Sequence, residues 1–323
     1  MAARGSLMTV TLNPALDVTA WVDAWEPQVK LASRRLKRDP GGGGINVARM
    51  ARRWLERESV EALAALGGPT GARLRDLLDA EDVPCAVFPI AEETRESWQI
   101  TLPDGGFYRI IHPGPRWRAQ ELAELGAVLA ERLRTSGPQW VVFSGSLPAG
   151  VAPAEMARLV ALVREAAPSA RIAVDTRGEA LVAALEAGVD LVKPDRREMA
   201  ELAGRLGHGR GDLLTLARRM VAAGRTRTFC YTLGPKGLVV VREGGAWRWE
   251  PPAVALVSLA GAGDFLLGTL IARVMRGDDW IEASRLAMAT AAATAATEGT
   301  SPPAREAVLD LAARVRRGAP EAG

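Results

Sequence analysis

The segment with the clearest chemical potential is Gly261-Ala262-Gly263-Asp264, which stands before an apolar, helix-forming stretch. Small residues let a backbone approach a phosphate closely, and the free N–H groups of a helix's first turn attract anions. An aspartate there can accept a proton from a substrate hydroxyl while the amides of Ala262, Gly263 and Asp264 hold a phosphoryl group. The segment therefore predicts phosphoryl transfer, with Asp264 as the base. Judged alone, an acid that only stabilises the first turn of the helix explains the segment equally well.

Two other phosphate-binding motifs fit this sequence poorly. A GxGxxG dinucleotide-binding turn would place its third glycine at position 266, which is leucine, and would need a further strand after the helix. Only helices are expected beyond Gly261. A GxxxxGK[ST] phosphate-binding loop is absent from the sequence.

A second glycine cluster, from Gly41 to Gly44, comes directly before Ile45 and Asn46. Consecutive glycines suit the close approach of a hydroxylated or phosphorylated ligand. Asn46, one turn into the helix that follows, can hydrogen-bond to sugar hydroxyls. A flexible loop with a surface asparagine is the competing interpretation.

Strands that alternate with helices must position these segments. Hydrophobic patterning predicts strands at 7–13, 59–66, 139–144, 171–175, 189–193 and 227–233, and helices at 45–57, 70–82, 119–135, 153–166, 178–187, 196–204 and 211–223. An antiparallel pair is expected at 237–242 and 246–250, then helices at 262–276, 280–297 and 304–317. Residues 39–44 read as a loop that no regular element contains. The alternation predicts an α/β protein with a parallel sheet covered on both faces.

Alternating segments early in the chain fit exposed strands. They lie at 19–25 and 30–37, and in a hairpin of 96–102 and 107–112 around Pro103-Asp104-Gly105-Gly106. We expect residues 18–38 and 86–112 to form a small β-sheet lid over one end of the main sheet, where it would exclude water. No linker divides the chain, so we expect residues 1–323 to form one domain.

Composition excludes several classes of protein. Hydrophobic residues make up 48% and charged residues 24% of the 323 residues, and no apolar run is long enough to span a membrane. The net charge of +3 is too small to imply nucleic-acid binding. The basic run Arg34, Arg35, Lys37 and Arg38 is either a solvated strand face or a positive rim that attracts phosphorylated substrates. Two distant cysteines, Cys85 and Cys230, favour a cytosolic location over a disulfide framework.

Taken together, these segments resemble the PfkB (ribokinase-like) carbohydrate kinases. The resemblance spans about residues 8 to 300 and rests on the order and spacing of seven motifs: TLNPALD at 11–17, GGGGIN at 41–46, SGSLP at 144–148, DTRGEAL at 175–181, LVKPDRRE at 191–198, LGPKG at 233–237 and GAGD at 261–264. The first of these looks like the family's first strand, ending in a sugar-binding Asp17. The resemblance implies a three-layer αβα sandwich with a mainly parallel central sheet and a small β-sheet lid.

The resemblance also implies a reaction between Mg·ATP and a sugar phosphate. The catalytic group would comprise Gly261, Ala262, Gly263 and Asp264. The residues that would bind the sugar phosphate are Asp17, Lys30, Gly42, Gly43, Asn46 and Arg95, with Lys30 reaching in from the lid. The nucleotide would contact Lys193, Thr232, Gly234 and Gly237, and Mg²⁺ would be held by Glu198, through water, and by Asp195.

Within the family, this sequence is most similar to the minor-type 6-phosphofructokinases. Position 43 is glycine, where many 1-phosphofructokinases and tagatose-6-phosphate kinases carry lysine. The expected acceptor is therefore fructose 6-phosphate, with fructose 1-phosphate or tagatose 6-phosphate as the alternative. The resemblance further implies a homodimer paired through the lids. The small net charge and the lack of a long apolar run predict no nucleic-acid or membrane partner.

Four departures from the family pattern leave open a ligand-binding pseudokinase. Asp195 stands where the family has Asn, Leu259 replaces a Thr, Phe265 replaces a residue that is often Ser, and the stretch before Gly299-Thr300 is about two residues short. None of these changes removes the base or the anion-binding turn. Slow catalysis or a shifted substrate would be their expected effect.

Overall fold

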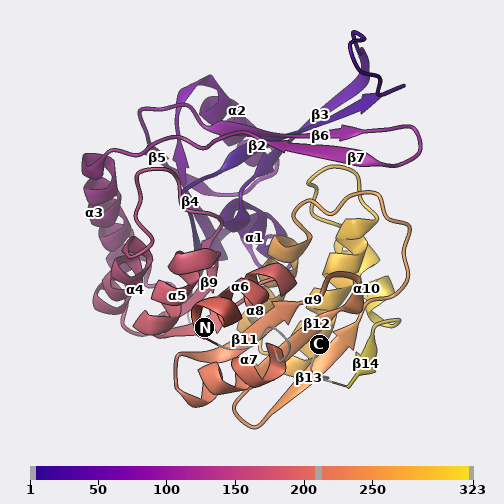
Figure 1. Ribbon diagram of the computed structural model, residues 1–323. Helices are drawn as coiled ribbons and strands as arrows, with labels where there is room; N and C mark the ends of the chain where they lie inside the picture. The colour runs from indigo at the N-terminus through magenta and orange to yellow at the C-terminus, as the bar shows by residue number, and fades with distance from the viewer. Residues whose placement is uncertain (1–4, 208–212, 320–323) are drawn as a thin grey trace.

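The computed structural model describes residues 5–207 and 213–319, which form two β-sheets and the helices that cover the larger sheet (Figure 1). The larger sheet has ten strands in the order β14-β13-β12-β11-β10-β9-β8-β1-β4-β5. Seven of them run parallel: β1 (Leu7–Thr11), β4 (Val60–Leu66), β5 (Cys85–Pro89), β8 (Trp140–Ser144), β9 (Arg171–Asp175), β10 (Val189–Val192) and β11 (Thr226–Thr232). The antiparallel strands β12 (Leu238–Arg242), β13 (Gly245–Glu250) and β14 (Arg316–Gly318) extend one edge.

Both faces of this sheet are buried under helices, which explains why its parallel strands read as continuous apolar runs. One hydrophobic cluster joins the sheet to α3 (Ala119–Ser136), α4 (Glu155–Ala166), α5 (Gly178–Ala187), α6 (Arg196–Arg205) and α7 (Leu213–Ala222). The other joins the opposite face to α1 (Gly43–Ala51), α2 (Gly68–Ala80), α8 (Ala262–Met275), α9 (Trp280–Ala295) and α10 (Arg305–Ala312). The three-layer αβα arrangement is therefore confirmed.

The smaller sheet, which we call the lid sheet, has the order β3-β2-β6-β7. Its strands are β2 (Ala15–Val22), β3 (Ser33–Gly41), β6 (Arg95–Thr101) and β7 (Phe107–Ile111). β2 pairs in parallel with β6, so two hairpins distant in sequence meet side by side at the top of Figure 1. The expected hairpin of 96–102 and 107–112 is the β6–β7 pair.

The base of the lid sheet is fastened to the C-terminal part of the chain. The Lys37 ammonium lies 3.1 Å from Asp39 Oδ1 and 3.0 Å from the Glu298 carbonyl oxygen. Arg35 forms an ion pair with Glu298, and Arg34 forms one with Asp23. These contacts account for most of the basic run and favour the strand-face interpretation.

Several expected boundaries were wrong. The glycine run is not a loop, because β3 continues through Gly41 and α1 begins at Gly43. The first strand ends at Thr11, and Asp17 lies in β2, opposite Asp39. Residues 85–89 form β5 of the larger sheet, so the lid receives only the later part of 86–112. The last expected helix ends at Ala312, and β14 follows it. Residues 211 and 212 of the expected helix 211–223 lie outside the described part of the chain.

The two cysteines are free thiols. Burial raises the pKa of both Cys85 and Cys230 to about 12, so neither is a reactive thiolate at neutral pH. None of the helices in the described part of the chain is long and apolar enough to cross a membrane.

Candidate active site

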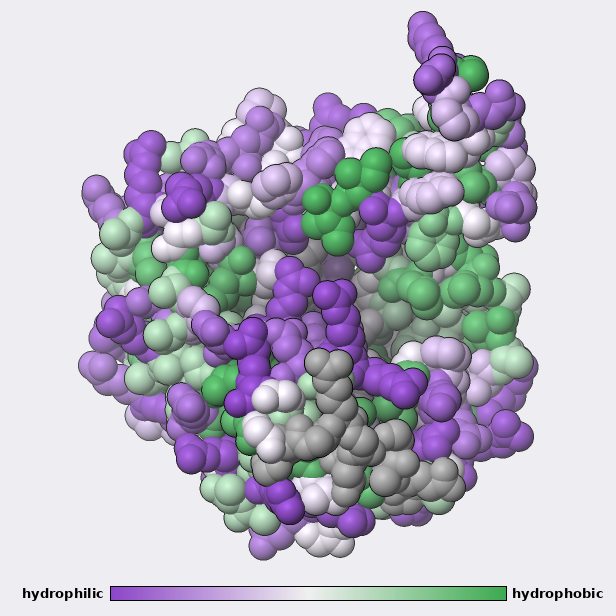
Figure 2. Space-filling view, in the orientation of Figure 1, coloured by the Kyte–Doolittle hydropathy of each residue, from purple (hydrophilic) through white to green (hydrophobic). Residues whose placement is uncertain are grey.

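A cavity of about 850 Å³ lies between the lid sheet and the carboxyl ends of β8 to β11. It appears in Figure 2 as a central hollow bordered by hydrophilic side chains beneath the lid. The lid contributes Arg95, Arg109 and Ile111, and the strand ends contribute residues such as Asp175 and Thr232. Ligands of open parallel sheets bind at this edge, where successive strand ends converge.

Most of the expected site residues meet at this cavity. Its lining includes Gly43, Arg95, Lys193, Asp195, Glu198, Thr232, Gly234, Gly263 and Asp264. Ala262 and Gly237 line an adjoining hollow, whereas Asp17, Gly42, Asn46 and Gly261 adjoin the lining residues without being part of the wall. Lys30 is exposed between β2 and β3 and does not line the cavity of the single chain.

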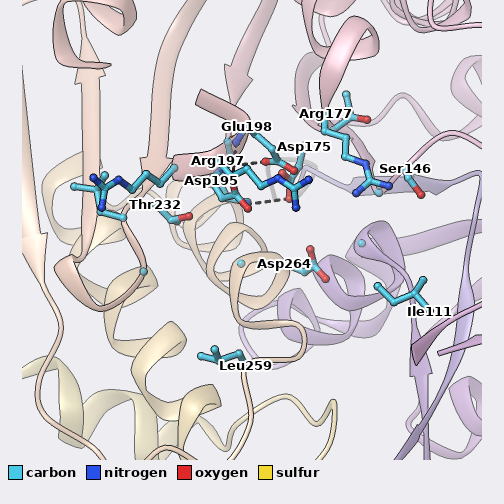
Figure 3. Close-up of a pocket in the computed structure, with 18 of the residues that line it drawn as sticks. Ile111, Ser146, Asp175, Arg177, Asp195, Arg197, Glu198, Thr232, Leu259 and Asp264 are labelled. Carbon is cyan, nitrogen blue, oxygen red and sulfur yellow. Dashed lines mark hydrogen bonds and ion pairs between the residues drawn. The ribbon is translucent and has the colours of Figure 1, made fainter. Parts of the chain in front are cut away.

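Figure 3 shows that the cavity has two ends, with the Asp264 carboxylate between them. Ser146, Arg177 and Ile111 lie at the end that we call the acceptor end. Thr232 and Leu259 lie at the opposite end, which we call the nucleotide end.

The turn before α8 is shaped by two glycines. Gly261 has φ 75°, and a Cβ there would lie 3.0 Å from the Phe265 ring and 3.1 Å from Thr300. A Cβ on Gly263 would lie 3.1 Å from the Lys193 ammonium. The missing side chain therefore lets a cation lie directly over the first turn of the helix. The Ala262 amide already donates to the Leu259 carbonyl oxygen at 3.4 Å, so the Gly263 and Asp264 amides are the better candidates for anion binding.

Asp264 is held by a buried hydrogen-bond network. Asn46 Nδ2 donates to Asp264 Oδ2 at 2.9 Å, and Asn46 Oδ1 accepts from Arg49 Nη1 at 3.1 Å. The Arg49 guanidinium is fully buried and also donates to the Pro40 and Thr300 carbonyl oxygens. Because Arg49 has no acceptor, it fixes which end of the Asn46 amide faces the aspartate. One carboxylate oxygen is thereby anchored and the other remains for a substrate.

The pKa of Asp264 is raised to about 6. Burial is the main cause and the charge of Asp175 adds to it, whereas the Asn46 hydrogen bond and Lys193 oppose it. A carboxylate with this pKa is ionised at neutral pH and is a stronger base than an ordinary aspartate.

Lys193 and Asp175 form a buried ion pair at 3.1 Å behind the turn. Burial lowers the pKa of Lys193, but Asp175, Asp264 and Glu198 outweigh it, so the ammonium stays charged. The pKa of Asp175 is raised by burial against the opposing effect of Lys193. A cation fixed beside the Gly263 amide is suited to the phosphates of a nucleotide.

Asp195 and Glu198 begin α6 and cap it reciprocally. Asp195 Oδ1 accepts from the Glu198 amide at 2.8 Å, and Glu198 Oε2 accepts from the Asp195 amide at 2.9 Å. Aspartate caps a helix as well as the family's asparagine would, which accounts for this departure. Each side chain keeps one carboxylate oxygen free of the capping contact, and both residues line the cavity.

These two acids fit a Mg²⁺ ion. Burial, reinforced by the charges of Asp175 and Asp195, raises the pKa of Glu198 to about 7. A bound cation would stabilise the ionised carboxylate and lower this pKa. Mg²⁺ prefers one or two carboxylates, water and substrate phosphates to a complete cage of protein ligands.

At the acceptor end, Asp17 is packed against glycine. A Cβ on Gly41 would lie 2.6 Å from the Asp17 carboxyl carbon, and a Cβ on Gly43 would lie 2.3 Å from Ser144 Oγ. Burial raises the pKa of Asp17, opposed by a hydrogen bond from Thr300 and by the charge of Arg109. The glycine cluster therefore serves close packing of polar groups rather than flexibility.

The nucleotide end continues into an apolar hollow of about 620 Å³. Gly237 at its wall has φ 106°, and a Cβ there would lie 1.9 Å from the Trp249 carbonyl oxygen. Leu259 is 54% exposed and borders both hollows, so the missing threonine hydroxyl is replaced by apolar surface. Phe265 is fully buried and points into the core, so this departure leaves the cavity unchanged.

Sequence reasoning did not assign roles to Arg109, Ser146, Asp175 and Arg177, all of which line the cavity. Ser146, Asp175 and Arg177 stand at or just after expected strand ends, and that position was the available signal. Arg109 and the buried Arg49 gave no comparable signal.

Comparison with known proteins agrees with this geometry. The model of the pfkB family carbohydrate kinases matches residues 10–307. The chain belongs to the PfkB family. It is 34% identical over 297 residues to the ATP-dependent 6-phosphofructokinase isozyme 2 of Mycobacterium tuberculosis, covering 91% of this chain and 85% of the relative. It is 32% identical over 312 residues to the 1-phosphofructokinase of Rhodobacter capsulatus, covering 96% of each protein.

Among solved structures, phosphofructokinase-2 from Escherichia coli in complex with fructose-6-phosphate superposes with a TM-score of 0.85. It is 28% identical and is matched over 96% of this chain and 99% of that one. As a PfkB carbohydrate kinase, the protein is a phosphotransferase that uses ATP to phosphorylate sugar phosphates.

Proposed function

We propose that this PfkB kinase transfers the γ-phosphoryl group of ATP to fructose 6-phosphate and forms fructose 1,6-bisphosphate. The observation that carries the proposal is the position of Asp264, between a cation-lined acceptor end and an apolar nucleotide end. The relatives named 6-phosphofructokinase isozyme 2 and the neighbour that holds fructose-6-phosphate support the choice of acceptor.

In the proposed reaction, each end of the cavity holds one substrate. Arg95 and the glycine turn at Gly43 bind the acceptor so that its free hydroxyl faces Asp264. The adenine enters the apolar hollow beside Thr232, and the ATP phosphates lie against Lys193. Mg²⁺, held by Asp195 and Glu198, would neutralise phosphate charge when bound.

The chemical step needs little beyond positioning and charge stabilisation. Asp264 accepts the proton of the acceptor hydroxyl. The hydroxyl oxygen bonds to the γ-phosphorus of ATP, and the bond from that phosphorus to the ADP oxygen breaks. The Gly263 and Asp264 amides and the Lys193 ammonium stabilise the charge on the moving phosphoryl group. The lid excludes water that would otherwise hydrolyse ATP.

Fructose 1-phosphate is the second candidate acceptor, favoured by the similarity to a 1-phosphofructokinase over 96% of the chain. Gly43 opposes it, because many 1-phosphofructokinases carry lysine at this position. A Cβ here would lie 2.3 Å from Ser144 Oγ, so a lysine could enter only if Ser144 moved.

The decisive test is ADP release in a coupled assay with Mg·ATP and a panel of acceptors: fructose 6-phosphate, fructose 1-phosphate, tagatose 6-phosphate and fructose. We expect the highest kcat/KM with fructose 6-phosphate and multiple turnovers. A higher kcat/KM with fructose 1-phosphate than with fructose 6-phosphate would make fructose 1-phosphate the preferred acceptor. Nucleotide binding without turnover of any acceptor would favour a ligand-binding pseudokinase.

We also propose that two chains pair through their lid sheets. Strand register places Leu36, Ile100 and Tyr108 in one row across the face opposite that of Arg109, and Ile110 lies on the same face. Leu36, Tyr108 and Ile110 are 37–49% exposed, and β3 and β7 are open edges of the lid sheet. Exposed apolar residues on an open-edged sheet are suited to pairing.

Light scattering after gel filtration tests the pairing. We expect the wild type to elute as a dimer and Tyr108→Asp combined with Ile110→Asp to elute as a monomer. An unchanged dimer mass in the variant would place the interface elsewhere.

A further inference from the structure

Three arginines converge on the acceptor end, and one of them comes from the body of the protein rather than the lid. Arg95 lies at the start of β6 and Arg109 in β7, whereas Arg177 follows β9 and stands directly before α5 without a side-chain capping hydrogen bond. All three line the cavity with Ser146. In Figure 3 the Arg177 side chain extends into the cavity toward Ser146.

These arginines lie close enough to repel one another. Burial is the main cause that lowers the pKa of Arg95, and the charges of Arg177 and Arg109 lower it further. Only Asp17 acts in the opposite direction. Concentrating like charges around one end of the cavity costs free energy unless an anion binds between them.

The donor groups of these arginines are largely unused. Arg95 Nε is buried without a hydrogen-bond partner, and Arg95 Nη2 donates only to the Asn13 carbonyl oxygen at 3.2 Å. The Arg109 contact with Ser97 Oγ is long, at 3.5 Å. Within residues 5–207 and 213–319, no ion pair involves Arg95, Arg109 or Arg177.

Acidic residues near Arg177 have other partners. Glu179, two residues later, pairs with Arg205 at 3.1 Å, and Asp175, two residues earlier, pairs with Lys193. The guanidinium of Arg177 is therefore left for a ligand, whereas Arg158, on an exposed helix face, pairs with Glu155.

We infer that Arg177 is a third ligand of the acceptor's phosphate and that it binds this group from the body, opposite Arg95 and Arg109 of the lid. The inference rests on the proposed function and adds a residue that sets acceptor specificity. A planar guanidinium binds a phosphate dianion through two parallel hydrogen bonds, which a neutral hydroxyl cannot match. A sugar without a phosphate would offset none of the repulsion that Asp17 leaves between the three cations, so the site should discriminate strongly against it.

The test compares Arg177→Gln with the wild type under saturating Mg·ATP. We expect the KM for fructose 6-phosphate to rise about 10- to 100-fold, the range that one charge-assisted hydrogen-bonded contact supplies. We expect kcat and the KM for ATP to change less than about twofold, because Arg177 contacts neither the base nor the nucleotide. The ratio of kcat/KM for fructose 6-phosphate to kcat/KM for fructose should fall by a similar factor in Arg177→Gln.

Arg158→Gln is the matched control, since it removes one guanidinium from an exposed helix face outside the cavity. Arg177→Lys should show an intermediate KM, because a point charge remains without the bidentate geometry. A KM for Arg177→Gln within twofold of the control would overturn the inference.

Calorimetric binding of fructose 6-phosphate without nucleotide separates this inference from the proposed function. A weaker affinity in Arg177→Gln than in the wild type supports the contact even if no acceptor turns over. Equal affinities of the two proteins would overturn the contact and leave the proposed reaction standing.

Discussion

Asp264 and Arg95 line the same cavity, yet their surroundings are built differently. The base has its hydrogen-bond partner in place, and that partner is oriented by the buried Arg49. Arg95 has a buried nitrogen without a partner and like charges nearby. The turn that we propose as catalytic thus has its polar partners in place, whereas the acceptor end carries a buried cationic donor without a partner.

This difference separates two kinds of variant. Changes at the catalytic turn should lower kcat, because the turn acts on the transition state. Changes at the acceptor end should raise KM, because in the proposed reaction its cations bind the same phosphate before and during phosphoryl transfer. The predictions below test this division in order of decreasing effect.

The largest effect is expected for Asp264→Asn. Removing the base should lower kcat by about 10²- to 10⁴-fold, the usual contribution of a positioned general base. The KM for fructose 6-phosphate should change little, because Arg95 and its neighbours remain. Steady-state kinetics measure both quantities. A kcat within tenfold of the wild type would show that another group accepts the proton.

Arg95→Gln should have the opposite signature. We expect the KM for fructose 6-phosphate to rise about 10- to 100-fold while kcat stays within a few-fold of the wild type. The same assay with ATP as the varied substrate serves as the control and should give an unchanged KM. If kcat fell instead, the division between the two ends would be wrong.

The pH dependence of kcat should show the state of the base. As the proposed base, Asp264 would act only when ionised, so kcat should fall about tenfold per pH unit below its pKa of about 6. The Asn46 hydrogen bond lowers this pKa, so Asn46→Ala should move the acid limb to higher pH.

The shift between variants is the quantity to measure, because a sugar phosphate also ionises near pH 6. Arg95→Gln, assayed at saturating acceptor, should leave the acid limb in place. An identical limb in the wild type and Asn46→Ala would mean that the acceptor's phosphate, and not Asp264, controls it.

The smallest effect concerns stability. The pKa of Asp264 is higher in the folded chain than in the unfolded one, so the folded state loses stability as the pH rises from about 4 to 6. Above pH 6 Asp264 is ionised in the folded chain, and the full loss of stability caused by its burial is present. Asp264→Asn should therefore raise the free energy of unfolding at pH 7 by about 1–2 kcal/mol. Urea unfolding at pH 7 and pH 4 measures it, and the gain should disappear at pH 4. A gain of the same size at both pH values would point to a cause other than ionisation.

The sequence was sufficient for features that depend on local pattern. The strand-helix alternation, the turn at Gly261–Asp264 and the arrival of Lys193 at a strand end all follow from neighbours in the chain. The contacts of Arg109 do not, because they depend on how β7 pairs with β6 and where the lid lies over the body. A one-residue shift in that pairing would turn Arg109 away from the cavity.

Glycine led to a wrong prediction where its missing side chain leaves room for a neighbouring group and does not serve backbone flexibility. Gly41 was expected in a loop, but it pairs with Ala15 as the last residue of β3, and the Asp17 carboxylate occupies the place that a side chain would take. The C-terminal segment was mispredicted for another reason: Arg316 and Arg317 are good helix formers, but they lie in a strand because they pair with β13. In both cases, tertiary contact decided the local structure.

The two free thiols make this chain a convenient background for spectroscopic labelling. With the pKa of Cys85 and Cys230 raised to about 12, thiol-specific dyes or spin labels should react slowly with the native protein at neutral pH. A cysteine introduced at an exposed lid position such as Pro103 would then be modified selectively, without first removing the natural cysteines. Such a probe would test whether the lid sheet moves when a sugar phosphate or a nucleotide binds.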